Sequence, residues 1–306
     1  MARLSTPFEH GWAEAPWLTE LLSQCRFPAP GTVVDCAVSG GPDSVALLVL
    51  ATAWGCRPTA HYVDHRLRRD SAADGEFVVA VAAALGVDSL VHHAVVEDGP
   101  DLEGRARRAR HDALPMGTFF GHTLDDQAET VLLALLRGTG PNGVAAMSTN
   151  QHPLLGLRRS ETLMLCERLA IDPVDDPSNR DRRFRRNRVR HELLPLMEQI
   201  ADRDVAPVIA RFAALQRDER DAFGLLVPDV DPTDCEAIQG LAPAVGAVVL
   251  RGWFRGVTGG PYGPDAAATE RMLAVANGTR PRADVTSGWQ ISRTGGRLRL
   301  DRATDR

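Results

Sequence analysis

Short apolar runs alternate with longer amphipathic ones between residues 31 and 149. The short runs are rich in β-branched residues and predict strands, whereas the longer runs have the spacing of helices with a buried face. We expect strands at Thr32–Val38, Thr59–Val63, Leu90–Val96 and Thr118–Phe120, and helices at Ser44–Ala53, Asp74–Leu85, Leu102–Leu114 and Asp126–Leu136. This alternation predicts an α/β fold, a doubly wound parallel sheet that binds ligands at the carboxyl ends of its strands.

A different pattern begins after residue 200. A helix rich in paired charges is expected over Asp202–Leu226, and the chain beyond it is richer in loop-forming residues. The segments Trp289–Arg293 and Arg297–Leu300 alternate on either side of a glycine turn, which predicts a terminal hairpin. We therefore predict a large α/β domain over 1–200, a helical linker over 201–226 and a small, mainly helical domain over 227–306.

The composition limits the class of protein. The 306 residues are 44% hydrophobic, which is enough for a substantial core, and the formal charge of -5 excludes a wholly basic nucleic-acid binder. Any RNA contact must then come from local basic patches. The five scattered cysteines support neither a disulfide framework nor a cysteine zinc site, and they fit a reducing cytoplasm. The longest apolar run, Val45–Trp54, is too short to span a bilayer, so we expect no membrane partner.

A glycine turn follows the first predicted strand, where Ser39–Ser44 has the sequence Ser-Gly-Gly-Pro-Asp-Ser. Its two glycines let a phosphate approach the backbone, its serines offer hydroxyl donors, and the next helix begins with unpaired N–H groups. Pro42 has no N–H to contribute. The alternative is a strand-to-helix turn capped by Asp43 or Ser44 that binds no ligand. The turn is not a Walker A loop, because the lysine of that motif is missing.

The Ser-Gly-Gly-x-Asp-Ser string resembles the PP-loop of the N-type ATP pyrophosphatases, which convert ATP to AMP and pyrophosphate. This resemblance implies that ATP is bound with Mg²⁺, and that Asp43 is a Mg²⁺ ligand or orders the reacting groups. It implies an ATP site made of Ala37, Ser39, Gly40, Gly41, Pro42, Asp43, Ser44, His61, Gly121 and His122.

Two carboxylates lie three positions apart in the fourth predicted helix. Asp126 and Glu129 share one helix face, and such a pair can hold an ammonium group or a Mg²⁺ ion. The alternative is structural, since Thr123 and Asp126 match a capping box. The stretch Gly121–Met147, which includes Arg137-Gly-Thr-Gly, resembles the signature of the tRNA(Ile)-lysidine synthetases. The resemblance implies that Asp126 and Glu129 are catalytic residues that bind the substrate lysine.

Two further stretches resemble the same family. The segment His61–Arg68 is similar to its second strand and following loop, and Arg105–Leu114 is similar to its arginine helix. Arg107 and Arg110 are therefore expected to act on the triphosphate, although a solvated basic face is an equally common arrangement. The two histidines of His61–Arg68 alternatively suggest a metal site, for which no further ligands are evident.

A strongly basic segment, Asp176–Arg190, stands in a chain whose net charge is negative. Arginine forks match phosphate oxygens, so ATP or RNA is the expected partner of this segment. The alternative is a solvated helix whose arginines pair with nearby acids. The segment resembles the family's Asp-Pro-x-Asn and Arg-Asn-x-x-Arg motifs, which implies that Arg186, Asn187 and Arg190 bind tRNA phosphates.

The resemblance runs from about Gly31 to Leu300. It implies a Rossmann-like PP-loop ATPase domain, the helical linker and a short tRNA-binding domain, as in a short form that lacks the further domain of longer members. One departure is the connection Pro115–Phe120, which is compressed relative to the family, where a longer helix end and a full strand are usual.

The implied reaction joins L-lysine to the wobble cytidine of tRNA(Ile) with a CAU anticodon, while ATP becomes AMP and pyrophosphate. The base carbonyl oxygen attacks the α-phosphorus, and the neutral lysine amine then displaces AMP. Two alternatives stay open. One is another PP-loop tRNA modifier such as a cytidine thiolase, which the lack of paired cysteines disfavours, and the other is a non-catalytic nucleotide- or RNA-binding module. The sequence also leaves a homodimer open.

Overall fold

The computed structural model describes residues 12–64, 71–94, 105, 109, 112–176, 181–259, 263–286 and 288–303. The chain divides into two compact units, residues 1–133 with 146–213 and residues 134–145 with 214–306. Helices α5 (Leu124–Leu136) and α10 (Ala206–Leu226) each cross from one unit to the other. The boundary inside α10 falls within the predicted linker, and the predicted three-part division stays a prediction.

The first unit contains a four-stranded sheet in the order β3-β2-β1-β4, made of β1 (Val33–Ala37), β2 (Arg57–Asp64), β3 (Asp88–His93) and β4 (Phe119–Phe120). All neighbouring strands are parallel, which confirms the prediction. β4 has only two residues and begins one residue later than the predicted strand Thr118–Phe120. β3 begins earlier than expected because its first residue already pairs with β2, and the predicted end of this strand lies outside the described residues.

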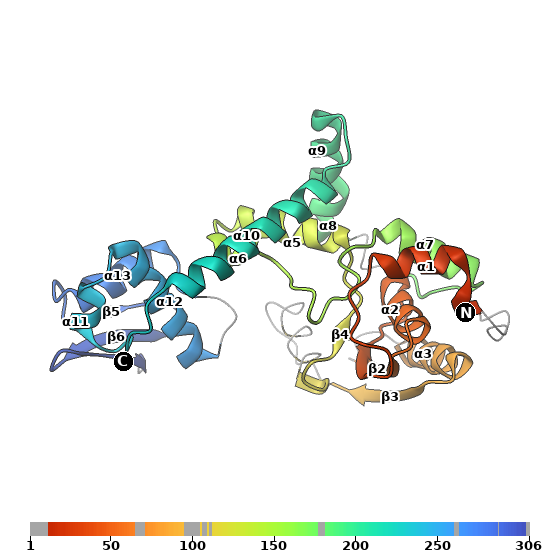
Figure 1. Ribbon diagram of the computed structural model, residues 1–306, viewed down its shortest axis with the longest axis horizontal. Coiled ribbons are helices and arrows are strands. Elements are labelled where there is room, and N and C mark those ends of the chain that lie inside the picture. Colours follow the sequence, from red (N-terminus) through yellow and green to blue (C-terminus); the bar gives the residue numbers. More distant parts are fainter. Residues whose placement is uncertain are drawn as a thin grey trace. The chain divides into compact units, whose positions relative to one another are not determined.

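Helix α2 (Pro42–Ala53) is buried on all sides, since every residue from 44 to 51 is buried. A helix that is apolar all round must be covered all round. The sheet covers one side of it, and α1 (Pro16–Ser23) and α7 (Arg159–Arg168) cover the other (Figure 1). Helix α3 (Ser71–Leu85) packs on β2 and β3. This packing fixes the start of α2 at the end of β1. The predicted helix over 102–114 lies largely outside the described residues.

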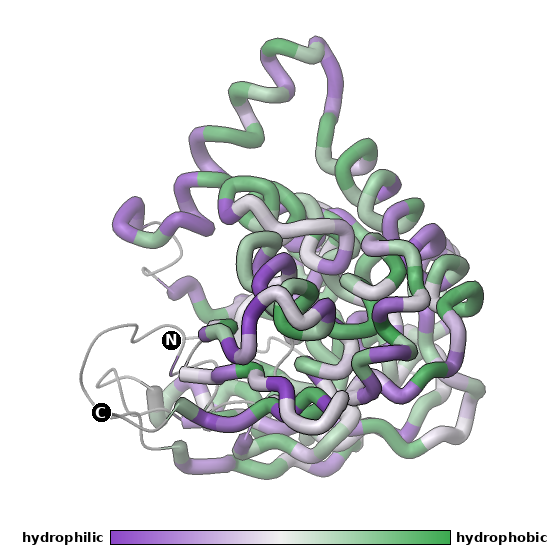
Figure 2. The backbone as a smooth tube through the Cα atoms, turned by 90° about the vertical axis from the view of Figure 1, so that its left-hand side faces the viewer, coloured by the Kyte–Doolittle hydropathy of each residue, from purple (hydrophilic) through white to green (hydrophobic). Residues whose placement is uncertain are grey.

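A second apolar cluster joins α5 to the basic segment and consists of Ala128, Leu132, Val189, Leu194, Val205 and Ala206. The segment forms α8 (Arg185–Arg188) and enters a π-helical turn (Val189–Leu193), and α9 (Leu194–Ala201) follows. The expected helix start at Asp202 was wrong, because Asp202 has a left-handed φ of 50° and ends α9. In the highest helices of Figure 2, α9 and the start of α10, hydrophobic and hydrophilic residues alternate.

The second unit is mainly helical and ends in an antiparallel sheet. It contains α6 (Pro141–Val144), α11 (Cys235–Gln239), α12 (Pro243–Thr258), α13 (Ala266–Ala276), β5 (Arg282–Asp284), β6 (Trp289–Thr294) and β7 (Arg297–Arg302). Strands β6 and β7 form the predicted hairpin. Helices α11 to α13 make this unit mainly helical, as predicted, and Leu250, Phe254 and Met272 build a buried core with Ile291. No described helix, including the short η1 (Trp12–Glu14), is long and apolar enough to cross a bilayer.

Candidate active site

The turn between β1 and α2 has the geometry of an anion site. Gly40 has a φ of +88°, and a Cβ at this position would lie 2.8 Å from Cγ2 of Val174, so only glycine fits. Gly41 is the N-cap of α2, and no side chain among the described residues caps this helix start. The first N–H groups of α2 are therefore available to a bound phosphate, together with the positive end of the helix dipole.

The two serines hold this turn closed. The backbone N–H of Ser39 donates to Oγ of Ser44 at 3.1 Å, and the two hydroxyl oxygens lie 3.2 Å apart. The Ser44 hydroxyl in turn donates to the carbonyl oxygen of Gly41 at 2.9 Å. In this arrangement the serine side chains hydrogen-bond within the loop and hold its shape.

The turn lies where the sheet order reverses, because β1 has β2 on one side and β4 on the other. Ala37, at the end of β1, pairs with His61 of β2 and with Phe120 of β4. Gly121 follows β4, and a Cβ there would collide with the carbonyl oxygen of Asp43. The predicted residues Ala37, Gly121 and the glycine turn are thus brought together at a topological switch point, the usual ligand crevice of such sheets.

The two predicted histidines are held by other side chains. Nε2 of His61 lies 2.8 Å from Oδ1 of Asp35, and its Nδ1 lies 2.8 Å from Nε2 of His92. Burial and the neighbouring His61 lower the pKa of His92. His122 lies beside His152, with 3.1 Å between their Nδ1 atoms. Within the described residues, no three His, Cys, Asp or Glu side chains form a metal site. The second histidine of the suggested metal pattern, His65, lies outside them.

Asp126 uses its two carboxylate oxygens differently. Oδ2 accepts hydrogen bonds from the N–H and the hydroxyl of Thr123, at 2.8 and 2.9 Å, so the capping contact weighed as the structural alternative is present. Oδ1 accepts from the guanidinium groups of Arg159 and Arg186, at 2.8 and 2.9 Å. Burial alone would raise the pKa of Asp126, but these arginines hold it well below the usual range. The carboxylate is therefore ionised at neutral pH.

Glu129 is completely buried and lies between two arginines of the basic segment. Nε of Arg190 donates to Oε1 at 2.6 Å, and Nε of Arg186 donates to Oε2 at 2.7 Å. Asn187, between them in sequence, donates from Nδ2 to the carbonyl oxygen of Asp181 at 2.8 Å. In this structure Arg186 and Arg190 therefore pair with the acids, and their predicted contact with tRNA phosphate stays a prediction.

Arg159 joins the acid pair to the phosphate loop. Besides Asp126, it contacts Oε1 of Glu129 and Oδ2 of Asp43, each at 3.4 Å. The hydroxyl of Thr162, also on α7, donates to the other oxygen of Asp43. Burial and the neighbouring Asp126 raise the pKa of Asp43 to about 6, while Arg159 and Thr162 oppose that shift.

Arg159 and Thr162 were not among the site residues predicted from the sequence. The available signal was the Arg158-Arg159 pair at a helix start. Arg158 donates from Nη2 to Asp125 at 2.8 Å, and the N–H of Arg159 donates to the same carboxylate at 2.8 Å. Asp125 thereby holds the start of α7 against the start of α5. The predicted catalytic residues Arg107 and Arg110 lie outside the described residues.

Comparison with known proteins gives the family. A family model described as the PP-loop domain matches residues 18–197. A tRNA(Ile)-lysidine synthase of Mycolicibacterium paratuberculosis is 41% identical over 244 residues, which cover 74% of this chain and 75% of the relative. One of Nocardia farcinica is 37% identical over 256 residues, which cover 78% and 79% of the two chains. The chain belongs to the tRNA(Ile)-lysidine synthase family. The phosphate loop, the acid pair and the basic segment all lie within the matched PP-loop domain.

A solved structure supports the fold of this lysidine synthase family member. A U34-tRNA thiolase of Methanococcus maripaludis with its [4Fe-4S] cluster superimposes with a TM-score of 0.51 and 15% identity, and covers 66% of this chain and 80% of that chain. All five cysteines of this chain are buried, and burial raises the pKa values of Cys25 and Cys166 to about 12.

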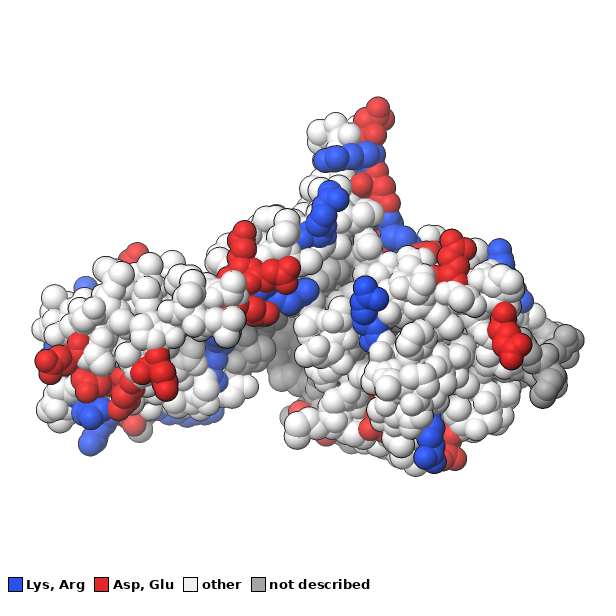
Figure 3. Space-filling model, viewed as in Figure 1, with Lys and Arg blue, Asp and Glu red and all other residues white. Residues whose placement is uncertain are grey.

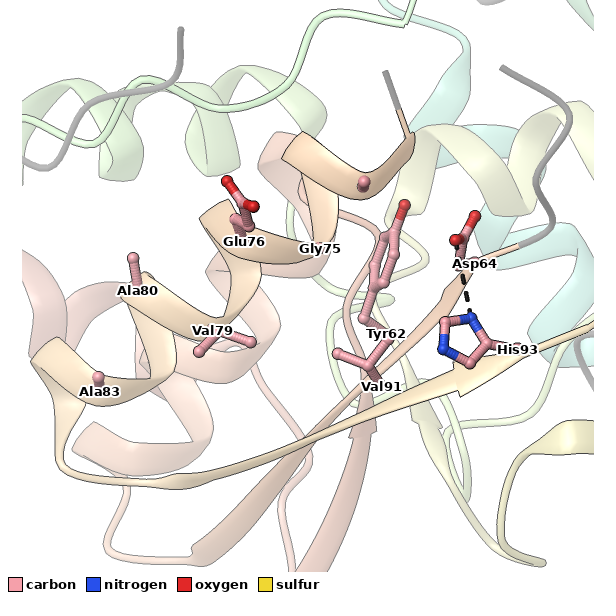
Figure 4. Close-up of a pocket in the computed structure, with 10 residues that line it drawn as sticks. Tyr62, Asp64, Gly75, Glu76, Val79, Ala80, Ala83, Val91 and His93 are labelled. Carbon is pink, nitrogen blue, oxygen red and sulfur yellow. Dashed lines mark ion pairs between the residues drawn. The ribbon is translucent and has the colours of Figure 1, made fainter. Parts of the chain in front are cut away.

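A pocket of about 420 Å³ lies between α3 and β2–β3 (Figure 4). Tyr62 and Val91 line it from the strands, and Asp64 lies 3.8 Å from His93 at its rim. Neither the phosphate loop nor the acid pair contributes a lining residue. The phosphate loop and the acid pair, which Arg159 links, form the candidate active site.

Proposed function

We propose that this protein ligates L-lysine to the wobble cytidine of tRNA(Ile) bearing a CAU anticodon. The carbonyl oxygen of cytidine forms a bond to the α-phosphorus of ATP, and pyrophosphate leaves. The lysine side-chain nitrogen then bonds to the activated carbon, while AMP leaves and the amine loses a proton. The observation that carries this proposal is the direct link from a phosphate loop to a buried acid pair through Asp43 and Arg159.

The loop residues fit the substrate ATP. Gly40 keeps the backbone open, and the uncapped start of α2 supplies N–H donors and a positive dipole. Catalysis in the first step then comes from positioning and from neutralising charge on the phosphates. Mg²⁺ bound with ATP would supply further neutralisation, and Asp43, the acid within the loop, would hold it. Arg107 and Arg110 are expected to assist on the triphosphate.

The acid pair fits the amino-acid substrate. An ammonium group is satisfied by ionised, buried carboxylates, and Asp126 stays ionised at neutral pH because its pKa is held low. Anchoring the α-ammonium of lysine at Asp126 and Glu129 leaves the side-chain amine free to lose its proton and attack. Lysine is thereby held by the group that does not react.

Contact with tRNA is expected from local basic groups rather than from a continuous basic field. On the face shown in Figure 3, acidic and basic side chains are interspersed in small groups. In the basic segment, Arg183 and Arg188 have side chains 87% and 63% exposed, so both can contact a phosphate. The flexible anticodon loop allows the cytidine to unstack and reach the nucleotide. We place the reaction in the cytoplasm. Whether the protein acts as a monomer or as a homodimer is measured by light scattering.

The test combines purified protein, ATP, Mg²⁺ and labelled lysine with CAU-anticodon tRNA(Ile). We expect label in the RNA and pyrophosphate release that depends on this tRNA. The matched control is tRNA(Met), which has the same anticodon sequence and is expected to remain unlabelled. Tight ATP or RNA binding without label or pyrophosphate release would show a non-catalytic module instead, and sulfur incorporation would show a thiolase.

A further inference from the structure

The side chain of Arg159 lies between the three carboxylates of the site. Its Nη2 is 2.8 Å from Asp126, whereas its contacts to Asp43 and Glu129 are both 3.4 Å. It is the first residue of α7 and its side chain is 22% exposed. Arg159 is thus firmly hydrogen-bonded to one acid only, and more loosely placed against the other two.

The charges of this cluster balance as the structure stands. The carboxylates of Asp43, Asp126 and Glu129 face the guanidinium groups of Arg159, Arg186 and Arg190. An arriving ammonium finds no excess negative charge, and the Asp126 oxygen that faces the cluster already accepts two hydrogen bonds. Without Arg159, three carboxylates face two guanidiniums, and the excess of one negative charge matches one ammonium group.

Arg159 also has a natural second partner. Asp43, which it contacts, is the second residue of α2, so the guanidinium lies beside the helix start that is expected to hold phosphate. A phosphate carries more charge than a carboxylate and accepts both prongs of a guanidinium. The other two arginines are held more closely, because each donates to Glu129 at 2.7 Å or less.

We propose that Arg159 occupies the place of the lysine ammonium until a nucleotide fills the loop, and then moves to a phosphate, so that lysine binds after ATP. Arg159 is in this sense a positioning residue that couples the two substrate sites. The inference rests on the proposed function, since it assumes that the acid pair receives lysine. It adds an order of binding and the residue that enforces this order.

The test measures the dissociation constant of labelled lysine by equilibrium dialysis, with and without α,β-methylene-ATP and Mg²⁺. For the natural protein we expect the analogue to strengthen lysine binding by roughly tenfold or more. In Arg159→Gln, lysine should bind without nucleotide, and the ratio of the lysine dissociation constants without and with the analogue should fall to near one. Arg159→Lys, which keeps the charge, should restore part of the ratio. Arg168→Gln is the matched control, because Arg168 lies at the other end of α7, 5.1 Å above the ring of Trp17.

Equal lysine affinity with and without the analogue in the natural protein would overturn the inference, as would an unchanged ratio in Arg159→Gln. Should that variant fail to fold, the natural protein still decides, since linkage requires lysine to strengthen binding of the analogue by the same factor. Transfer of lysine to tRNA is scored separately. If lysine is transferred to tRNA but the analogue does not change the affinity for lysine, only the order of binding is refuted. If no lysine is transferred, the proposed function itself is refuted.

Discussion

Replacing Glu129 by glutamine tests the acid cluster most directly. The change keeps the shape of the side chain but removes a charge that is completely buried and contacts Arg186 and Arg190 at 2.7 and 2.6 Å. An amide cannot neutralise these two guanidiniums, and its NH₂ group faces one of them as a second donor. Breaking a buried ion pair from one side costs about 3–5 kcal/mol. With roughly 2–4 °C per kcal/mol for a unit of this size, the melting temperature should fall by about 6–20 °C.

The assay separates the structural role of Glu129 from its role in binding. Thermal unfolding by far-UV circular dichroism and lysine transfer to tRNA are measured for Glu129→Gln and for the double variant Glu129→Gln/Arg190→Gln. The double variant again has equal numbers of acids and arginines, so most of the stability should return. Lysine transfer should stay lost, because one of the two carboxylates that anchor the ammonium is still missing. ATP binding should persist in both variants.

Two results would refute this reasoning. A loss of under about 1 kcal/mol in Glu129→Gln would put the pair in the class of exposed ion pairs, and the cluster would not be a tightly packed unit. Normal lysine transfer by the double variant would show that Glu129 only balances the arginines. In that case the lysine site would have to be sought elsewhere.

Three further predictions concern the loop and the thiols. Gly40→Ala should abolish binding of an ATP analogue, because the added Cβ would collide with Val174. The control is Gly31→Ala, where φ is a similar +85° but the space around the Cβ is open. This control should lose only roughly 1–2 kcal/mol of stability and should still bind the analogue. As the pH rises from 3.8 to about 6, the natural protein should lose stability relative to Asp43→Asn, because the folded state keeps the Asp43 proton up to a higher pH than the unfolded state does. Parallel pH profiles of the free energy of unfolding for the two proteins would contradict the raised pKa. The buried cysteines should react with a thiol reagent only when the protein unfolds. An iron chelator should leave lysine transfer to tRNA intact, and a loss of transfer on adding the chelator would point to an iron–sulfur cluster.

The sequence by itself determined the features that depend on neighbouring residues. The alternation of apolar runs predicted the parallel sheet, and the contiguous string Ser39–Ser44 predicted the anion turn, because strand, turn and helix start are set by local geometry. The spacing of Asp126 and Glu129 placed both on one helix face for the same reason. The terminal hairpin followed from alternation around a glycine turn.

Only the tertiary structure decided which charges meet. Arg159 contacts Asp43, which is 116 positions away, and Arg190 contacts Glu129 across 61 positions. A chain with 35 basic and 40 acidic residues has very many conceivable pairings. The choice among them is made by apolar packing, which brings α7, α5 and the basic segment together, and the charge pattern does not specify that packing. Whether an arginine faces a phosphate or a buried acid is therefore a property of the folded molecule.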